Sequence, residues 1–168
     1  MSLIRLLAVF LCFLMVVSCG NDDDDSDELS LADFVFEVQQ LPEGCILASL
    51  KSDEDTPCGV QSNPLVSSER QFLDCFAGEL LHDEILVADV HSGLFSVYVG
   101  KDEIGVFGLE FSSPILASQG ASLLRKENSE PQRFAVFQKE RIVILLWRDD
   151  ESDACFDRFK ELITERME

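Results

Sequence analysis

The stretch Phe134–Trp147, FAVFQKERIVILLW, is the clearest indication of the fold of this chain. Its segments 134–138 and 141–147 are rich in apolar and β-branched residues, and the charged pair Lys139-Glu140 separates them. Such runs around a short polar break predict two strands joined as a hairpin. Residues 142–146 are apolar at every position, which predicts a central strand covered on both faces of its sheet.

A similar order of elements precedes this hairpin. Runs typical of strands occupy 94–99 and 104–111, and Ser113 followed by Pro114 is typical of a helix N-terminus. After the hairpin, Ser152 begins a last helix whose apolar spacing predicts one buried face. That face consists of Phe156, Phe159, Ile163 and Met167.

The N-terminal half is less regular. Alternating apolar residues predict a short strand over 34–38, and the composition of 45–50 and of 85–91 also favours strands. Ser92-Gly93 then marks either a turn or a bulge in one longer strand. A helix is expected from Ser68, where the pattern Ser-x-x-Gln matches a capping box. Its stripe of large apolar residues is Phe72, Phe76 and Leu80.

Together these elements predict a fold of the α+β class. We expect a mainly antiparallel sheet of about five to seven strands with three helices packed against it, since consecutive strands pair before each helix. Residues 33–168 form this single domain, which is long enough to bury about two-thirds of its extended-chain surface. Residues 1–18 and 19–32 differ from it in composition and are assigned other roles.

Residues 1–18 have the form of a secretory signal peptide. Arg5 supplies a positive charge, and Leu6–Val17 is an unbroken run of 12 apolar residues. As a helix this run would be about 18 Å long, whereas the hydrocarbon core of a bilayer is about 30 Å thick. We therefore expect a leader that is cleaved off, and no membrane-spanning helix in this segment.

The leader ends in Val16-Val17-Ser18-Cys19, which resembles the lipobox of bacterial lipoproteins. The resemblance implies cleavage before Cys19, attachment of diacylglycerol to the Cys19 sulfur, and acylation of the new amino group by a fatty acid such as palmitate. Two acyl chains are enough to anchor a protein stably in a membrane. The resemblance thus implies a lipid-anchored protein of the bacterial cell envelope, located at the outer membrane.

Residues 19–32 link this lipid to the domain. Six of the seven residues from Asp22 to Glu28 are acidic, and such a run repels itself and is expected to be disordered. One interpretation is a spacer that holds the domain away from anionic headgroups. The other is surface export, because the run resembles the acidic tags that follow the lipidated Cys in some surface lipoproteins of Gram-negative bacteria.

The chain as a whole is strongly acidic. Its formal net charge of −19 becomes −20 once the single charge of the leader, Arg5, is removed. A protein with this charge disfavours nucleic acid and anionic membrane surfaces as partners. Contact with the membrane is therefore expected through the lipid on Cys19.

Four cysteines remain after the leader and the lipidated position are set aside: Cys45, Cys58, Cys75 and Cys155. An even number in an exported protein predicts two disulfides, for which three pairings exist. We favour Cys45–Cys58, which would close a polar loop, together with Cys75–Cys155, which would join two helices. None of the four forms a C-x-x-C pair, so common zinc sites are not expected.

The sequence lacks the common catalytic and phosphate-binding motifs. Asp89, His91 and Ser92 are close in sequence, but neighbouring residues rarely give the convergent geometry of a catalytic triad. The segment from Asp149 opens like a calcium-binding loop and then departs from that pattern. We therefore assign no catalytic residue, no cofactor and no metal ligand.

These observations predict a non-catalytic domain that binds a small ligand or another envelope protein. Two alternatives stay open: an envelope hydrolase with an acidic site of unfamiliar pattern, and a purely structural or assembly role. A pocket with converging Asp, Glu or His side chains would favour the hydrolase. An apolar patch or groove would favour binding.

Overall fold

The computed structural model describes residues 29–50, 56–101, 103–149 and 154–168. The leader, the lipobox with Cys19 and the acidic run of the tether lie outside these ranges. Residues 31 and 32, assigned above to the tether, belong instead to the first short helix, and Leu31 is 2% exposed. The ordered domain therefore begins earlier than the expected residue 33.

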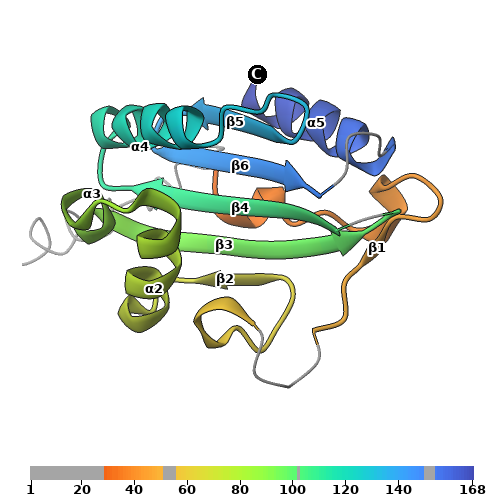
Figure 1. Ribbon diagram of the computed structural model, residues 1–168, viewed down its shortest axis with the longest axis horizontal. Coiled ribbons are helices and arrows are strands. Elements are labelled where there is room, and N and C mark those ends of the chain that lie inside the picture. Colours follow the sequence, from red (N-terminus) through yellow and green to blue (C-terminus); the bar gives the residue numbers. More distant parts are fainter. Residues whose placement is uncertain (1–28, 51–55, 102, 150–153) are drawn as a thin grey trace, which may run out of the picture.

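The fold is α+β, with one antiparallel sheet of six strands in the order β1-β3-β4-β6-β5 and with β2 also paired to β3 (Figure 1). This confirms the predicted class and sheet type. The strands are β1 (Ile46–Leu47), β2 (Leu65–Ser67), β3 (Val90–Val99), β4 (Glu103–Phe111), β5 (Phe134–Lys139) and β6 (Ile142–Arg148).

Helices cover both faces of this sheet. One face carries α2 (Arg70–Leu81), α3 (Glu84–Ala88) and α4 (Pro114–Glu127). The opposite face carries α5 (Ala154–Met167) and the short 3-10 helix η1 (Leu31–Phe34). Two further 3-10 turns are η2 (Val38–Gln40) and η3 (Pro57–Gly59). The sheet thus separates two hydrophobic clusters. The cluster beneath α2, α3 and α4 is here called the α2-face cluster, and the cluster beneath α5 and η1 the α5-face cluster.

Strand β6 occupies the inner position that its sequence predicts. Ile142, Ile144 and Leu146 belong to the α5-face cluster. Val143 and Leu145 belong to the α2-face cluster. Because successive strand residues point to opposite faces, an unbroken apolar run is what a strand covered on both sides requires. The prediction for 142–146 is confirmed.

Two more predictions of local structure are confirmed. The β5–β6 hairpin turns at Glu140, which adopts a left-handed conformation with φ of 48°. Helix α4 begins with Pro114, and the Ser113 hydroxyl accepts a hydrogen bond from the Leu116 amide at 3.4 Å. The predicted buried face of α5 is also present, with Phe156, Phe159 and Ile163 in the α5-face cluster.

The predicted strand over 34–38 is wrong. The chain forms η1 and η2 here and crosses the α5 face of the sheet instead of joining an edge. The edge of β3 near Tyr98 and Val99 is already paired with β1. Phe34 and Phe36 are nevertheless both buried. Burial of alternate residues follows here from contact with the sheet surface, without any strand pairing.

The predicted strand over 85–91 is wrong in its first half. Residues 84–88 form α3, because the Asp83 carboxylate accepts hydrogen bonds from the Ile85 and Leu86 amides at 3.0 Å each and so caps a helix. Strand β3 starts only at Val90. Residues 90–99 form one strand, so Ser92-Gly93 marks no turn. The pairing with β4 shifts register between Val90 and Ser92, which places a bulge at His91, one residue before the predicted Ser92-Gly93.

Helix α2 has the expected buried stripe but not the expected cap. It begins at Arg70, and Glu69 occupies the N-cap position. The Ser67 hydroxyl, and not that of Ser68, accepts a hydrogen bond here, from the Glu69 amide at 3.1 Å. The capping box predicted at Ser68 is therefore wrong, and the helix starts two residues later than expected.

All four expected cysteines are in disulfides, but the favoured pairing is wrong. The bonds are Cys45–Cys155 and Cys58–Cys75, with Cα–Cα distances of 5.9 and 5.5 Å. Cys75 and Cys155 cannot meet, because α2 and α5 pack on opposite faces of the sheet and a disulfide needs Cα atoms about 5.5 Å apart. Cys45 and Cys58 are divided in the same way between the two clusters.

Candidate functional site

The α5 face carries a hollow of about 400 Å³ where η1, η2 and the last turn of α5 meet. Its apolar lining consists of Leu29, Ala32 and Val35. Its polar lining consists of Asp33, Glu37, Gln40 and Arg166. Two segments from opposite ends of the chain therefore form one site, here called the Arg166 hollow.

Tyr98 holds the backbone at Phe36, between the lining residues Val35 and Glu37. Its hydroxyl accepts a hydrogen bond from the Phe36 amide at 3.1 Å and donates to the Phe36 carbonyl at 3.4 Å. The rings of Tyr98 and Phe36 both pack on Phe159 of α5, with centroid distances of 4.5 and 5.3 Å. A buried strand residue thereby holds the N-terminal segment against the C-terminal helix.

The Cys45–Cys155 disulfide adds a covalent link between the same two segments. Cys45 follows η2 and Cys155 lies in the first turn of α5, and the bond spans 110 residues of sequence. Both cysteines are buried, at 2% and 5% exposure. The walls of the hollow are therefore held by packing, by hydrogen bonds and by a cross-link.

Arg166 is the only cation among the residues that line the hollow. Its guanidinium carbon lies 4.3 Å from the centre of the Phe36 ring, a cation–π geometry. Its Nη2 donates to the Gln40 side-chain oxygen at 3.5 Å, whereas its Nη1 is buried and has no hydrogen-bond partner among the described residues. A buried donor without an acceptor costs free energy.

Burial lowers the pKa of Arg166, while the charges of Asp33, Tyr98 and Glu165 act in the opposite direction. Asp33 and Arg166 thus interact through space, yet no ion pair joins them in the described part of the chain. The Asp33 carboxylate instead accepts hydrogen bonds from the Ser30 amide at 2.7 Å and the Ser30 hydroxyl at 3.0 Å. Arg166 therefore keeps an unused donor although a carboxylate is close.

Burial raises the pKa of the Tyr98 hydroxyl, and it outweighs the opposing effects of Ser96, of the Phe36 backbone and of the Arg166 charge. The hydroxyl is therefore a neutral donor and acceptor at physiological pH. Because both of its hydrogen bonds go to the Phe36 backbone, its role is to position the wall of the hollow.

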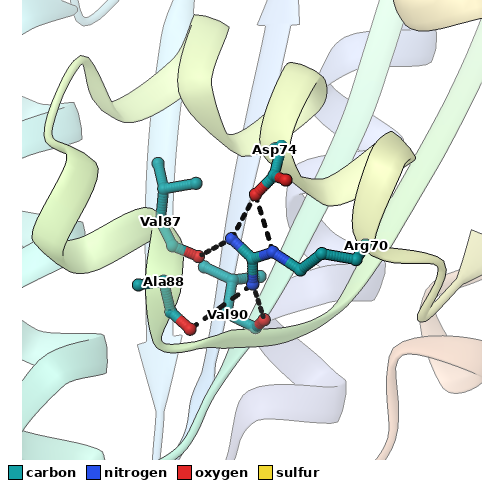
Figure 2. Close-up of polar contacts among 5 residues, drawn as sticks. All are labelled: Arg70, Asp74, Val87, Ala88 and Val90. Carbon is teal, nitrogen blue, oxygen red and sulfur yellow. Dashed lines mark hydrogen bonds and ion pairs between the residues drawn. The ribbon is translucent and has the colours of Figure 1, made fainter.

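On the α2 face, each nitrogen of the Arg70 guanidinium has a hydrogen-bond acceptor (Figure 2). Its Nε donates to Asp74, with which it also forms an ion pair, and its Nη2 donates to the Val87 carbonyl at 2.9 Å. Its Nη1 lies 3.4 Å from the carbonyls of Ala88 and Val90. The Val87 and Ala88 carbonyls belong to the last turn of α3, and the Val90 carbonyl to the start of β3. Arg70 is thus a structural cap, and its donors are not available to a ligand.

The residues that the sequence offered for catalysis do not come together. The Asp89 carboxylate accepts a hydrogen bond from the Ser112 hydroxyl at 3.2 Å, and among the described hydrogen bonds none joins Asp89 to His91 or Ser92. His91 is exposed at the β3 bulge. Within the described ranges no group of three or more His, Cys, Asp or Glu side chains is arranged to hold a metal ion. Most of the loop that starts at Asp149 lies outside these ranges.

Sequence reasoning did not find Tyr98, Arg166 or the hollow. One signal for Arg166 was present, because it follows the buried residues Phe159 and Ile163 at helical spacings of seven and three and so lies near the apolar face of α5. A cation at such a position needs a compensating contact, which here is the Phe36 ring. That contact comes from a segment more than 100 residues away, which no local pattern reveals.

Comparison of the chain with protein-family models, with curated proteins and with solved structures found no match. Within the part of the chain that the structure describes, no helix is long and apolar enough to cross a membrane. The Arg166 hollow is therefore the feature of the protein that indicates a function.

Proposed function

We propose that this protein is a lipid-anchored component of the bacterial cell envelope whose domain binds a small ligand without catalysis, in the Arg166 hollow. The observation that carries the proposal is the place of Arg166 in the lining of the hollow, beside apolar residues and without an ion pair among the described contacts. A carboxylate or phosphate group of a ligand would bind its guanidinium, since guanidinium groups favour such oxygens. The volume of about 400 Å³ is in the range of small-molecule sites.

The hydrolase alternative has less support at this site. Asp33 and Glu37 both line the hollow, but the Oδ2 atom of Asp33 already accepts two hydrogen bonds from Ser30. A general acid and base need freedom to exchange protons with a substrate. The Tyr98 hydroxyl is bonded to the Phe36 backbone. Arg166 adds a cation to the same lining, which suits recognition of an anionic group.

The position of the hollow also agrees with an anchored protein. Leu29 lines it, and only nine residues lie between Cys19 and Leu29. The ten residue steps from Cys19 to Leu29 span at most about 35 Å when fully extended. A lipid on Cys19 would therefore keep the hollow close to the membrane surface, where it would meet ligands held at or released near that surface.

Lipid labelling tests the anchoring half of the proposal. The full chain, expressed in a Gram-negative host with labelled palmitate, should incorporate label. Cys19→Ala should lose the label and leave the membrane fraction or keep its leader, whereas Cys12→Ala should behave like the parent chain. Label in Cys19→Ala at the parent level would reject lipidation at this residue.

Ligand titration tests the binding half. Backbone NMR signals of η2 and of the last turn of α5 should shift when acetate or inorganic phosphate is added to the mature chain. Arg166→Gln should abolish these shifts. Arg158→Gln is the matched control, because Arg158 lies on the same helix and pairs with Glu161 at 3.0 Å, outside the hollow. Equal shifts in both variants would reject Arg166 as the anchor.

A further inference from the structure

The charges around the Arg166 hollow are of both signs. Arg166 lies at one part of the lining, and the carboxylates of Asp33 and Glu37 at others. Asp33 and Arg166 are close enough to interact electrostatically, but they do not form an ion pair among the described contacts. Opposite charges therefore line one space without neutralising each other directly.

We propose that the ligand of this hollow is a small zwitterion, with its anionic oxygen group on Arg166 and its ammonium group facing Asp33 and Glu37. This inference rests on the proposed function and specifies the ligand class. The chemistry is shared by a free α-amino acid and by the phosphoethanolamine headgroup of a phospholipid. Both carry an anionic group and an N–H-bearing ammonium only a few bonds apart.

A ligand with a single charge would meet a repulsive group in the same space. A simple anion on Arg166 would also face two carboxylates, in a chain whose formal net charge is −19. A simple cation beside the carboxylates would face the guanidinium. A zwitterion is attracted at both ends, and its lack of net charge avoids the repulsion from the acidic surface.

The apolar lining fits the remainder of such a ligand. Leu29, Ala32 and Val35 lie among the charged residues and offer contact to the methylene groups that separate the two ends. The Gln40 side chain has its oxygen committed to the Glu37 amide at 3.0 Å and to Arg166. The charged groups that remain for a ligand are then those of Arg166, Asp33 and Glu37, beside the Gln40 amide nitrogen.

The experiment is a calorimetric titration of the mature chain, with both disulfides intact, using glycine, glycerophosphoethanolamine, acetate, inorganic phosphate and methylamine as separate probes. A zwitterion should bind at least tenfold more tightly than acetate, inorganic phosphate or methylamine. Arg166→Gln should lose this binding. Glu37→Gln should reduce the preference for the zwitterion toward the level of acetate. Arg158→Gln should bind like the parent chain.

Two further measurements separate the sources of the zwitterion and exclude unfolding. Co-sedimentation of unlipidated mature chain with vesicles of phosphatidylethanolamine, but not of phosphatidylcholine, would identify a headgroup, since the quaternary ammonium of choline has no N–H donor. Binding of glycine alone would identify a free amino acid. Thermal midpoints of all variants should stay close to that of the parent chain.

The outcomes distinguish the two proposals. If acetate or phosphate binds as tightly as the zwitterions and depends on Arg166, the zwitterion inference is overturned and the proposed function stands. If methylamine binds best, the inference is also overturned, and so is the role of Arg166 as anchor. If no probe binds at millimolar concentration, both proposals fail together.

Discussion

The two faces of the sheet are built in different ways. The α2 face is covered by elements that follow one another along the chain, from η3 through α4. The α5 face is covered by the N-terminal segment and the C-terminal helix, which the whole sheet separates in sequence. Each face has its own disulfide, and the bonds span 110 residues on the α5 face and 17 on the α2 face.

This difference explains where the candidate site lies. On the α2 face, Arg70 is satisfied by carbonyls of a neighbouring element and caps a helix end. On the α5 face, Arg166 meets a segment from the far end of the chain, and one of its donors stays unused. Places where elements distant in sequence meet, such as interfaces between domains or between helices, are common places for ligand sites.

Removal of either disulfide should give the largest loss of stability, and it tests the difference between the two faces most directly. In the chain-entropy model, loss of a cross-link over 110 residues costs about 5 kcal/mol and loss of one over 17 residues about 3 kcal/mol. The double variant Cys45→Ala/Cys155→Ala should therefore be less stable in urea unfolding than Cys58→Ala/Cys75→Ala. The reverse order would mean that the α5 face does not depend on its long-range link.

Truncation of one buried ring on each face should give the next largest effect. Phe159→Ala and Phe76→Ala each remove a ring that is at most 3% exposed and should cost about 3–5 kcal/mol. Only Phe159 touches Tyr98 and Phe36, so only its loss should also shift the NMR signals of η2. A shift of those signals in Phe76→Ala would show that the faces are coupled through the sheet.

Tyr98→Phe tests the polar link between the segments. It leaves the buried Phe36 amide without its acceptor and should cost about 1–3 kcal/mol, measured by urea unfolding at pH 7. The variant should also change the response to alkali. Because the pKa of Tyr98 is raised in the folded state, the parent chain keeps this stabilisation below about pH 10 and loses it as the pH rises through the folded-state pKa.

The alkaline part of that prediction has its own control. The unfolded tyrosine loses its proton first, so the free energy of unfolding of the parent chain should fall above about pH 10. Tyr98 is the chain's single tyrosine, and Tyr98→Phe should therefore lack this slope. An identical slope in both proteins would show that other groups cause the alkaline loss.

Substitution of the two arginines should give the smallest changes in stability, and it distinguishes a helix cap from a ligand site. Arg70→Gln removes a half-exposed cap of the α3 carbonyls and should cost about 0.5–1 kcal/mol. Arg166→Gln should change stability by less than about 0.5 kcal/mol, because it removes the contact with the Phe36 ring and the bond to Gln40 but also removes a buried donor without an acceptor, and these effects offset each other. Equal losses in thermal unfolding would assign Arg166 a structural role like that of Arg70.

Much of the C-terminal half was predictable from local patterns. The continuous apolar run of β6, the Ser113-Pro114 start of α4 and the apolar stripe of α5 each express burial through spacing along a single element. The N-terminal half was predicted poorly. The apolar alternation at 34–38 and the β-branched residues at 85–91 predicted strands. Residues 34–38 instead cross the face of the sheet in 3-10 turns, and the Asp83 cap begins a helix at 84–88.

The class of the fold and the buried faces of β6, α2 and α5 were predictable from local patterns, because hydrophobic periodicity records the local environment of each strand and helix. The face of the sheet that each element covers is set by the tertiary structure and not by these patterns. That choice sets the pairing Cys45–Cys155 and Cys58–Cys75. It also brings Phe36, Tyr98 and Arg166 together. Contacts between segments so distant in sequence depend on the path of the whole chain, which no short stretch encodes.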